Sequence, residues 1–563
     1  MKGFCSCLIA FLSISYSILN AQTPDWAWAK SAGIKYGREK SNDIVVDEEG
    51  NSYIIGVFLD TIRFDTSLLI NPPFNTNQDV FIVKYSSTGN VIWAKSVSSI
   101  SIDEGMSIAV DNAGNVYVTG AIQGDCHIGN FSVTWHGEFD LFVLKLDSNG
   151  NALWLKSAGG FASEIAYSIA VDNQGNAYVA GGYRSDTINF GSFMLTNIYT
   201  TSWLSNIFIV KYSPSGNVLW AKSANGGAED FARSIAVDSE GNSYISGKAE
   251  SSTITFGDSA YHNFSPTFLA KYNTNGDCIW VKELGGIYQK GINLTVDLNG
   301  YLYGCCNVDN FPFTINDSII SNTDSNTAFI LKFNPLGDIA WSKSLTGFIS
   351  HVKIDEKSNL YITGTYNRNS YFGTTALLCQ DTIQTIFVAK LDSLANPIWA
   401  KSGGKIGGAY SDVYPSTCSC GIGIDDFGDV YITGAYKRDS LKFGNVTLLN
   451  SSINYQYPTP DLYIARLSMS AGITEQNNKS VPFTISPNPF SSLLSISLPN
   501  RPIHFLNISV NNVLGQTVFT TTEDSPNSAV PKTLNLSNIP QGMYFLQLNV
   551  DGVYYSQKIL KVG

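Results

Sequence analysis

A tryptophan followed two residues later by a lysine recurs along this chain at nearly constant intervals. The line is best seen as Trp-Ala-Lys-Ser, and successive tryptophans stand 58 to 66 residues apart. The seven copies are Trp28, Trp93, Trp154, Trp220, Trp280, Trp341 and Trp399. A fixed period on this scale is typical of repeat architectures, in which each unit buries its apolar face against its neighbours. The period therefore constrains the fold of most of the chain.

Each repeat is predicted to contain four short strands. In one unit, the β-branched run 168–172 and the run 177–182 flank a Gln-Gly-Asn turn. The runs 208–212 and 218–222 flank a second turn, Ser-Pro-Ser-Gly-Asn. Gly, Asn and Pro favour tight turns, and no segment of the unit has helical periodicity. Four such strands per repeat predict a propeller blade.

The order of the strand lines predicts how the ring closes. The first three lines of the repeat occur seven times, but the fourth follows only six of these sets. The remaining fourth-strand line, around Trp28, is the first in the chain. Pairing it with the last third strand would leave no bare sheet edge. We therefore predict an all-β fold with a seven-bladed β-propeller at 22–468, closed by the N-terminal strand. A non-closing solenoid is the alternative.

The repeated lines resemble the bacterial SBBP family of beta-propeller repeats over roughly residues 26–468. The resemblance is carried by the tryptophan line, by turn-and-strand lines such as 172–181, and by apolar runs that end in a cation, such as 208–211. Two units depart from the pattern, because Cys306 and Ser358 stand where the other units have Gly. The resemblance implies the propeller fold and leaves the ligand open.

The N-terminal residues 1–21 are predicted to be a secretory signal peptide. Lys2 precedes a short apolar stretch over 8–19, and Ala21 offers a small residue for cleavage before Gln22. A lipoprotein signal is disfavoured, because Cys5 and Cys7 lack a lipidation context. At the other end of the repeats, residues 469–482 are polar and unpatterned, as expected for a linker.

Residues 483–563 lose the repeat and alternate apolar with polar residues in short runs, which predicts a small Ig-like β-sandwich. This segment resembles the type A C-terminal sorting domain of the type IX secretion system, also called the Por secretion tail. The motifs are 486–490 (Ser-Pro-Asn-Pro-Phe), 514–516, 542–544 and the basic end 558–561. The sorting residues implied by the resemblance are Pro487, Asn488, Pro489, Gly515, Gly542, Tyr544, Lys558 and Lys561. An adhesive Ig-like module is the alternative.

The sorting-domain resemblance also implies a route and a location. The signal peptide would direct export across the inner membrane, and the tail would engage the type IX machinery at the outer membrane. The mature protein would then be secreted, either extracellular or attached to the outer-membrane surface. No stretch after the signal peptide reaches the roughly 18 apolar residues of a transmembrane helix.

Composition and motifs exclude several function classes. The net charge of −11 argues against nucleic acid as a partner. We find no nucleophile elbow, zinc-protease motif or phosphate-binding glycine loop, and no cysteine–histidine set with zinc spacing. The repeated Asp of the first turn is expected to accept backbone N–H groups rather than to bind calcium. We therefore expect no catalytic residues, no metal and no cofactor.

Two groups of residues are candidates for ligand binding. Acids near the start of the innermost strands could ring the propeller axis and bind a cation or basic ligand; alternatively they are solvated loop acids. These are Glu39, Asp103, Glu164 and Asp230. Loop aromatics suit stacking on sugars or peptides, or else pack onto the blades. This second group, with one adjacent histidine, is Trp135, His136, Tyr199, Trp203, Tyr410 and Tyr414.

The sequence favours a secreted or cell-surface binding module that is not an enzyme and that takes a glycan or a protein on its loops. Because a fold does not fix a function, two alternatives stay open. One is a polysaccharide-acting enzyme on a propeller scaffold. The other is a structural protein of the surface layer.

Overall fold

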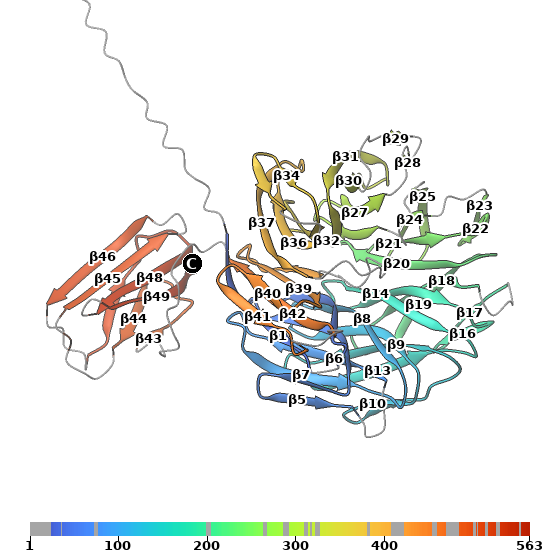
Figure 1. The fold of residues 1–563 in the computed structure, drawn as a ribbon, viewed down its shortest axis with the longest axis horizontal. Helices are drawn as coiled ribbons and strands as arrows, with labels where there is room; N and C mark the ends of the chain where they lie inside the picture. Colours follow the sequence, from blue (N-terminus) through green and yellow to red (C-terminus); the bar gives the residue numbers. More distant parts are fainter. Residues whose placement is uncertain are drawn as a thin grey trace, which may run out of the picture. The chain divides into compact units, whose positions relative to one another are not determined.

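The structure is a computed structural model. It describes residues 24–34, 37–71, 77–198, 204–262, 267–284, 292–308, 313–315, 318–320, 327–379, 383–406, 421–452, 459–468, 483–498, 503, 505–512, 516–524, 530–550 and 553–562. The expected signal peptide and linker lie outside these residues. All regular secondary structure in the described part of the chain is β-strand (Figure 1), which confirms the all-β prediction. The chain divides into two compact units, Met1–Met469 and Ser470–Gly563.

The first unit repeats one antiparallel sheet of four strands; in the third sheet, the two hairpin strands at 253–262 pair onto the fourth strand, which makes six. The first three sheets are β2 (Lys40–Val46), β3 (Ser52–Leu59), β6 (Gln78–Tyr85), β7 (Val91–Val97); β8 (Asp103–Val110), β9 (Val116–Ile122), β12 (Asp140–Leu146), β13 (Ala152–Ala158); and β14 (Glu164–Val171), β15 (Ala177–Tyr183), β18 (Asn206–Tyr212), β19 (Val218–Gly226). The next three are β20 (Asp230–Val237), β21 (Ser243–Ala249), β24 (Thr267–Tyr272), β25 (Cys278–Glu283); β26 (Asn293–Val296), β27 (Leu302–Val308), β30 (Thr327–Phe333), β31 (Ile339–Thr346); and β32 (Phe348–Ile354), β33 (Leu360–Tyr366), β36 (Thr385–Leu391), β37 (Pro397–Lys405).

The seventh sheet combines strands from both ends of the repeat region. It is formed by β38 (Gly421–Ile424), β39 (Val430–Tyr436), β42 (Asp461–Ser468) and β1 (Asp25–Ala32). β1 is antiparallel to β42, with Trp28 opposite Arg466. The first strands of successive sheets contact one another from β2 through to β38, and β38 contacts β2.

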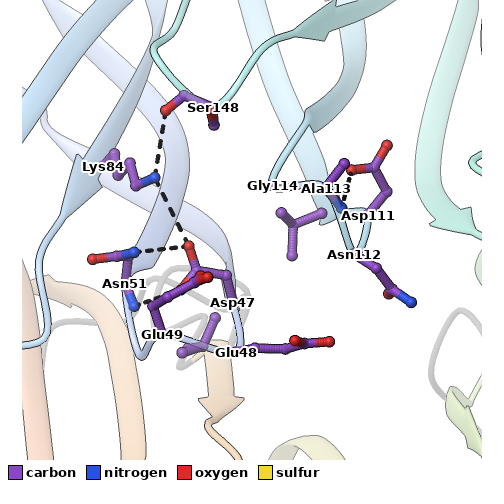
Figure 2. A pocket seen from close by; sticks show the side chains of 12 residues that line it. Asp47, Glu48, Glu49, Asn51, Lys84, Asp111, Asn112, Ala113, Gly114 and Ser148 are labelled. Atoms are coloured by element: carbon purple, nitrogen blue, oxygen red, sulfur yellow. Dashed lines mark hydrogen bonds and ion pairs between the residues drawn. The ribbon is translucent and has the colours of Figure 1, made fainter. Parts of the chain in front are cut away.

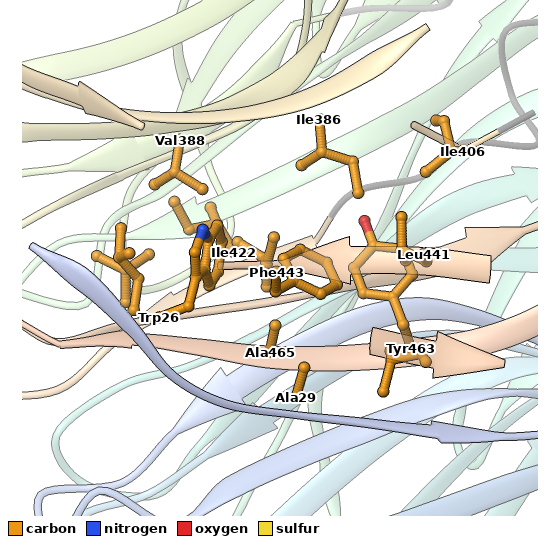
Figure 3. Packing of buried hydrophobic residues seen from close by; sticks show 14 of the residues in the cluster. Trp26, Ala29, Ile386, Val388, Ile406, Ile422, Leu441, Phe443, Tyr463 and Ala465 are labelled. Carbon is orange, nitrogen blue, oxygen red and sulfur yellow. The ribbon is translucent and has the colours of Figure 1, made fainter. Parts of the chain in front are cut away.

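β1 also contributes to the core between the sixth and seventh sheets (Figure 3). The Trp26 ring lies 4.6 Å from the Phe443 ring, and its indole N–H donates to the Ser402 carbonyl at 3.1 Å. Ile386 and Val388 of the sixth sheet belong to the same buried cluster. The first strand in the chain is therefore held by packing as well as by strand pairing.

A short hairpin stands between the second and third strands of every sheet, where the sequence predicted only a connecting loop. The hairpins are β4 (Thr61–Phe64) with β5 (Ser67–Ile70), β10 (Cys126–Ile128) with β11 (Phe131–Val133), β16 (Thr187–Phe190) with β17 (Phe193–Thr196), β22 (Thr253–Phe256) with β23 (Ser259–His262), β28 (Phe313–Ile315) with β29 (Ser318–Ile320), β34 (Ser370–Phe372) with β35 (Thr375–Leu377), and β40 (Ser440–Phe443) with β41 (Val446–Leu449). In four of the hairpins a Phe-Gly pair stands at the turn, with Phe190, Phe256, Phe372 and Phe443. Phe190, for example, is buried 5.5 Å from Phe208 of the third strand.

The first turn of each sheet is fixed by one aspartate. In the first sheet, Asp47 accepts hydrogen bonds from the Asn51 backbone N–H at 2.7 Å and from the Tyr53 hydroxyl at 2.8 Å. The Lys84 ammonium of the third strand lies 3.8 Å from the Asp47 carboxylate and 4.8 Å from the centre of the Tyr53 ring. The expectation that this Asp accepts backbone N–H groups is confirmed.

The repeated tryptophans join neighbouring sheets. The Trp93 ring packs 6.0 Å from Tyr53 of its own sheet, and its indole N–H donates to the Ser148 carbonyl of the next sheet at 3.1 Å. A Cβ at Gly150 would lie 2.8 Å from the Trp93 ring, so this turn must approach with a glycine. The same bond is made by Trp28, Trp154, Trp220 and Trp280. The packing interpretation of the tryptophans is confirmed.

Two tryptophans lack this bond, and their surroundings explain why. In the described residues the buried indole nitrogens of Trp341 and Trp399 have no hydrogen-bond partner. Facing Trp341, the sixth sheet carries Ala395 at a φ of 59° where five other sheets have glycine. Facing Trp399, the seventh sheet has no turn between its third and fourth strands, because its fourth strand is β1.

The second unit packs two sheets around one core. The strands β43 (Thr484–Ser486), β44 (Leu493–Ser497) and β47 (Lys532–Asn535) form one sheet. The strands β46 (Thr517–Asp524), β45 (Phe505–Asn512), β48 (Gly542–Val550) and β49 (Val553–Lys561) form the other. Leu494 and Ile496 of the first sheet share a buried cluster with Ile508 and Leu546 of the second. This is the arrangement of a small β-sandwich.

We expect Ala395→Gly to stabilise the first unit by about 1–2 kcal/mol. Glycine adopts the left-handed conformation without the steric cost that alanine has there, and it lets the turn approach Trp341 closely enough to accept the indole N–H. Urea unfolding followed by tryptophan fluorescence measures the change. Gly150→Ala is the matched control and is expected to destabilise, since its Cβ meets the Trp93 ring. A neutral or destabilising Ala395→Gly would contradict this explanation of the unpaired Trp341.

Candidate functional site

The antiparallel sheets of the first unit have two different ends. At one end lie the tight turns between first and second and between third and fourth strands; we call this the turn face. At the other end lie the hairpins and the connections between sheets; we call this the loop face. A site on either face is built from segments of neighbouring sheets.

A cavity of about 380 Å³ opens on the turn face between the first and second sheets (Figure 2). Asp47, Glu48 and Glu49 line it from one turn, and Asp111 lines it from the next. Lys84 donates to the Ser148 carbonyl at 3.4 Å and also lies beside Asp47, as Figure 2 shows. Asp47 and Asp111 each accept a backbone N–H within their own turn. These two acids of the cavity therefore have structural roles.

On the loop face, a connection of the second sheet runs alongside the segment that leads into the third sheet. The Glu138 N–H donates to the Ala162 carbonyl at 3.3 Å, and the Glu164 N–H donates to the Phe139 carbonyl at 2.7 Å. Gly137, at a φ of 101°, leaves no room for a Cβ, which would lie 2.2 Å from the Gly160 carbonyl oxygen. Backbone contacts thus hold the two segments together.

This paired segment presents an exposed aromatic group. The Phe161 side chain is 92% exposed, which is unusual for so large an apolar ring. The half-buried Trp135 donates its indole N–H to the Glu138 carbonyl at 3.2 Å, and its backbone N–H donates to Asp125. The exposed His136 lies 3.4 Å from the buried Asp140 carboxylate. The structure therefore places the predicted Trp135 and His136 on segments in contact with the one that carries Phe161.

Sequence reasoning missed Phe161, although the chain offered a signal. Phe161 follows Gly159 and Gly160 in a connection between strands and has no place in the repeated apolar pattern. The other aromatics proposed for ligand binding lie outside the described residues. They are Tyr199, Trp203, Tyr410 and Tyr414.

The acids predicted near the innermost strands are not exposed on the loops. All four side chains are fully buried: Glu39, Asp103, Glu164 and Asp230. Asp103 accepts hydrogen bonds from the Ser99 hydroxyl at 2.7 Å and the Gln123 backbone N–H at 3.2 Å. Glu164 likewise accepts backbone N–H groups of Gly160 and Ser185. Neither a solvent-lined acidic ring nor solvated loop acids describe these residues, because all four are buried inside the fold.

Three of these buried acids face a second buried acid, which opens the third strand of the preceding sheet. The pairs are Glu39 with Asp461, Asp103 with Asp79, and Glu164 with Asp140. Asp79 and Asp103 bond to each other, and in the described residues no side chain outside the pairs donates to the carboxyl oxygens of Glu39 or Asp79. The fourth interface differs, because Asn206 stands at the position of the second acid and accepts the Gly226 N–H at 2.9 Å.

Burial shifts the ionisation of these pairs. Burial and the neighbouring Asp103 raise the pKa of Asp79 to about 8, and burial with the nearby Asp461 raises the pKa of Glu39 to about 9. Burial also raises the pKa of Asp103 to about 6, although its hydrogen bonds oppose the shift. Cys126 is the other titratable group beside Asp79 and Asp103, and burial raises the pKa of its thiol to about 12. Without a cation, Asp79 and Glu39 are therefore protonated at pH 7.

This protonation predicts that the stability of the folded protein, with no cation bound, falls as the pH rises. Asp79 and Glu39 bind protons more tightly when folded, so their stabilising effect is complete below the unfolded pKa near 4 and is lost as pH rises through 8 to 9. We expect Asp79→Asn, which copies Asn206, to flatten this decline in urea unfolding measured in EDTA at pH 5, 7 and 9. Asp258→Asn changes an exposed acid and is the control. Parallel curves for Asp79→Asn and the parent protein would contradict the assignment.

In the second unit, the Ser-Pro-Asn-Pro-Phe motif holds the last strand. The Asn488 side chain accepts the Leu560 N–H at 2.9 Å and donates to the Lys558 carbonyl at 3.1 Å. The Phe490 N–H donates to the Leu560 carbonyl at 2.9 Å. Pro487 and Pro489 flank Asn488, and both follow cis peptide bonds. The motif residues therefore act on the backbone of β49.

The other predicted sorting residues that the structure describes belong to β49 or to β48, which pairs with it. Lys561 donates from its ammonium to the Leu536 carbonyl at 2.6 Å, and the Tyr544 hydroxyl donates to the Pro540 carbonyl at 2.8 Å. Gly542 pairs with Lys561 and has a φ of 147°, which favours glycine. Gly515 lies outside the described residues.

Comparison with known protein families confirms both resemblances. Residues 484–562 match the family described as a secretion system C-terminal sorting domain. Residues 224–252 match the family described as a beta-propeller repeat. The sorting domain indicates export by the type IX secretion system, so the protein is secreted or located at the cell surface.

Curated relatives share only part of their length with this chain. The uncharacterized WD repeat-containing protein L264 of Acanthamoeba polyphaga mimivirus is 24% identical over 64% of this chain and 32% of that protein. The regulatory protein FlaEY of Caulobacter vibrioides is 30% identical over 20% of this chain and 12% of that protein. The chain therefore spans about a third or less of these relatives.

Solved structures of similar chains are distant. A Bacteroides caccae protein of unknown function is 14% identical, covers 57% of this chain and 89% of its own, and has a TM-score of 0.34. The structure titled YCF48 bound to D1 peptide is 8% identical, covers 80% of this chain and 99% of its own, and has a TM-score of 0.34. At these TM-scores we base no argument on the likeness.

In the described residues, no helix is long and apolar enough to cross a membrane. No group of three or more histidine, cysteine or acidic side chains converges there in a way that could hold a metal ion.

Proposed function

We propose that this protein is a non-catalytic binding module, displayed at or released from the cell surface, which takes a glycan or protein ligand on its loop face. The observation that carries the proposal is the 92% exposure of Phe161 on a segment in contact with the one that carries Trp135 and His136. Exposed aromatic rings on a soluble protein favour interaction sites, because their flat apolar faces lose little entropy when they stack on a ligand.

We further propose that the seven repeated sheets are the blades of a closed, seven-bladed propeller. The antiparallel pairing of β1 with β42 supports closure, because it supplies the seventh sheet with its fourth strand. The contacts of each first strand with the next, including β38 with β2, support a ring rather than an open solenoid. A closed ring would give the loops between sheets a rigid base, and rigid loops bind with a smaller entropic cost.

The polar groups near Phe161 suit a ligand that combines apolar and hydroxylated surfaces. His136 and Glu138 are exposed beside Trp135, and each can exchange hydrogen bonds with a hydroxyl or amide group. Glu138 already accepts the Ser163 hydroxyl at 2.6 Å, which fixes its orientation. Sugar rings have one apolar face and a rim of hydroxyls, so a glycan is the ligand class that this arrangement supports best.

A glycan array probed with the mature full chain tests the proposal, followed by calorimetry with the best ligand. Phe161→Ala and Trp135→Ala are each expected to weaken binding by at least about tenfold, since aromatic anchors contribute most of the binding energy at such sites. Phe427→Ala removes an exposed phenylalanine from the opposite turn face and is the matched control, with unchanged affinity expected. Binding that survives both loop-face substitutions would place the ligand elsewhere.

The sorting domain gives a separate prediction about export. Removal of residues 483–563 is expected to leave the first unit in the periplasm, detected by fractionation and immunoblotting. Asn488→Ala is expected to reduce export as well, because it removes the two hydrogen bonds that the Asn488 side chain makes with β49. Asn507→Ala, in the same unit, removes a half-buried amide that bonds to Thr522 and is the control. Normal surface display of the truncated chain would contradict the sorting role.

A further inference from the structure

The buried acid pairs between adjacent sheets have no role in the proposed ligand site. They recur at three successive interfaces: between the seventh and first sheets, the first and second, and the second and third. Each pair brings one acid at the start of a first strand against one at the start of a third strand. A repeated buried pair of like charges is costly unless something compensates it.

At the interface between the first and second sheets, the two acids of the pair differ in their hydrogen bonds. Asp103 is well satisfied, since it accepts the Ser99 N–H, the Ser99 hydroxyl and the Gln123 N–H. Asp79 is fully buried beside it and bonds to Asp103 through the carboxyl groups, while no other group in the described residues bonds to its oxygens. Two buried carboxyl groups that face each other need a shared proton or a cation between them.

The pair between the seventh and first sheets shows the same difference between its two acids. Asp461 accepts the Ser451 N–H at 2.7 Å and the Ser451 hydroxyl at 2.6 Å. Glu39 is fully buried near it, and in the described part of the chain no side chain donates a hydrogen bond to its carboxyl oxygens. In both pairs a serine orients one acid, while the other acid receives no hydrogen bond from a side chain outside the pair.

We propose that these interfaces are binding sites for a hard divalent cation of the calcium class, each held by two carboxylates from neighbouring sheets. Two carboxylates balance the charge of one such cation, and binding releases to solvent any proton that the pair holds. Ser99 and Ser451 add hydroxyl oxygens to the first two sites, and calcium accepts carboxylate, hydroxyl and carbonyl oxygens together. The ion would join one sheet to the next.

The fourth interface supports the assignment by contrast. Asp230 occupies the position of Asp103, but Asn206 replaces the second acid. The Asn206 carbonyl oxygen accepts the Gly226 N–H, and Asp230 accepts the Ser251 hydroxyl. Where only one carboxylate is present, hydrogen bonds from the protein satisfy its oxygens. The chain thus contains interfaces with two facing acids and one interface with an acid facing an asparagine. The fold therefore accepts Asn at the position of Asp79.

Calcium itself is the probe, added to the mature full chain after EDTA treatment. We expect calorimetry to find three ions per chain, and 5 mM CaCl₂ to raise Tm by about 3 °C or more. Asp79→Asn should bind one ion fewer and show a smaller rise in Tm. Asp140→Asn tests the next interface in the same way, should Asp79→Asn fold poorly. Asp258→Asn should behave like the parent protein.

Three results would overturn the proposal. One is the absence of calcium binding and of any calcium-dependent change in Tm in the parent protein. The second is an unchanged number of ions in both Asp79→Asn and Asp140→Asn, which would place the ions elsewhere. The third is an equal loss of ions in Asp258→Asn. None of these results bears on ligand binding at Phe161, so the two proposals fail independently.

Discussion

The first unit depends on one aspartate in each sheet, which acts on three parts of the structure at once. In the first sheet, Asp47 closes a turn through a backbone N–H, holds the hydroxyl of the buried Tyr53, and lies beside the ammonium of Lys84. Tyr53 in turn supports Trp93, which bonds to the next sheet. A single carboxylate therefore connects a local turn to the contact between sheets, and its repetition explains why the seven units look alike.

Most of the strand framework was predictable, because its signals are local. Turns such as 172–176 and strands such as 208–212 follow from residues that are neighbours in the sequence. The hairpins between second and third strands were missed, since each has strands of only three or four residues and depends on a phenylalanine such as Phe190 packing onto a distant strand. Predicted elements thus failed where tertiary contacts, rather than local pattern, decide the structure.

The candidate sites show the same division. Trp135 and His136 could be identified as loop residues, but their proximity to the Phe161 segment follows from backbone bonds between two sheets. The acids were found at the correct positions and given the wrong surroundings, because an acid in a connection is usually solvated. Glu39 and Asp103 are buried only because a neighbouring sheet covers them. Burial of this kind cannot be deduced from the residues that flank an acid.

The pairing of β1 with β42 has a consequence for how the first unit folds. These strands join residues 25–32 to residues 461–468, while every other four-stranded sheet uses a continuous stretch of chain. Contacts between such distant segments form slowly, since the whole intervening chain must first become ordered enough to bring them together. Six sheets can therefore form from local contacts before β1 pairs with β42 and completes the seventh. During that interval the edge of β42 stays available to other strands, which makes this edge the point most exposed to misassembly.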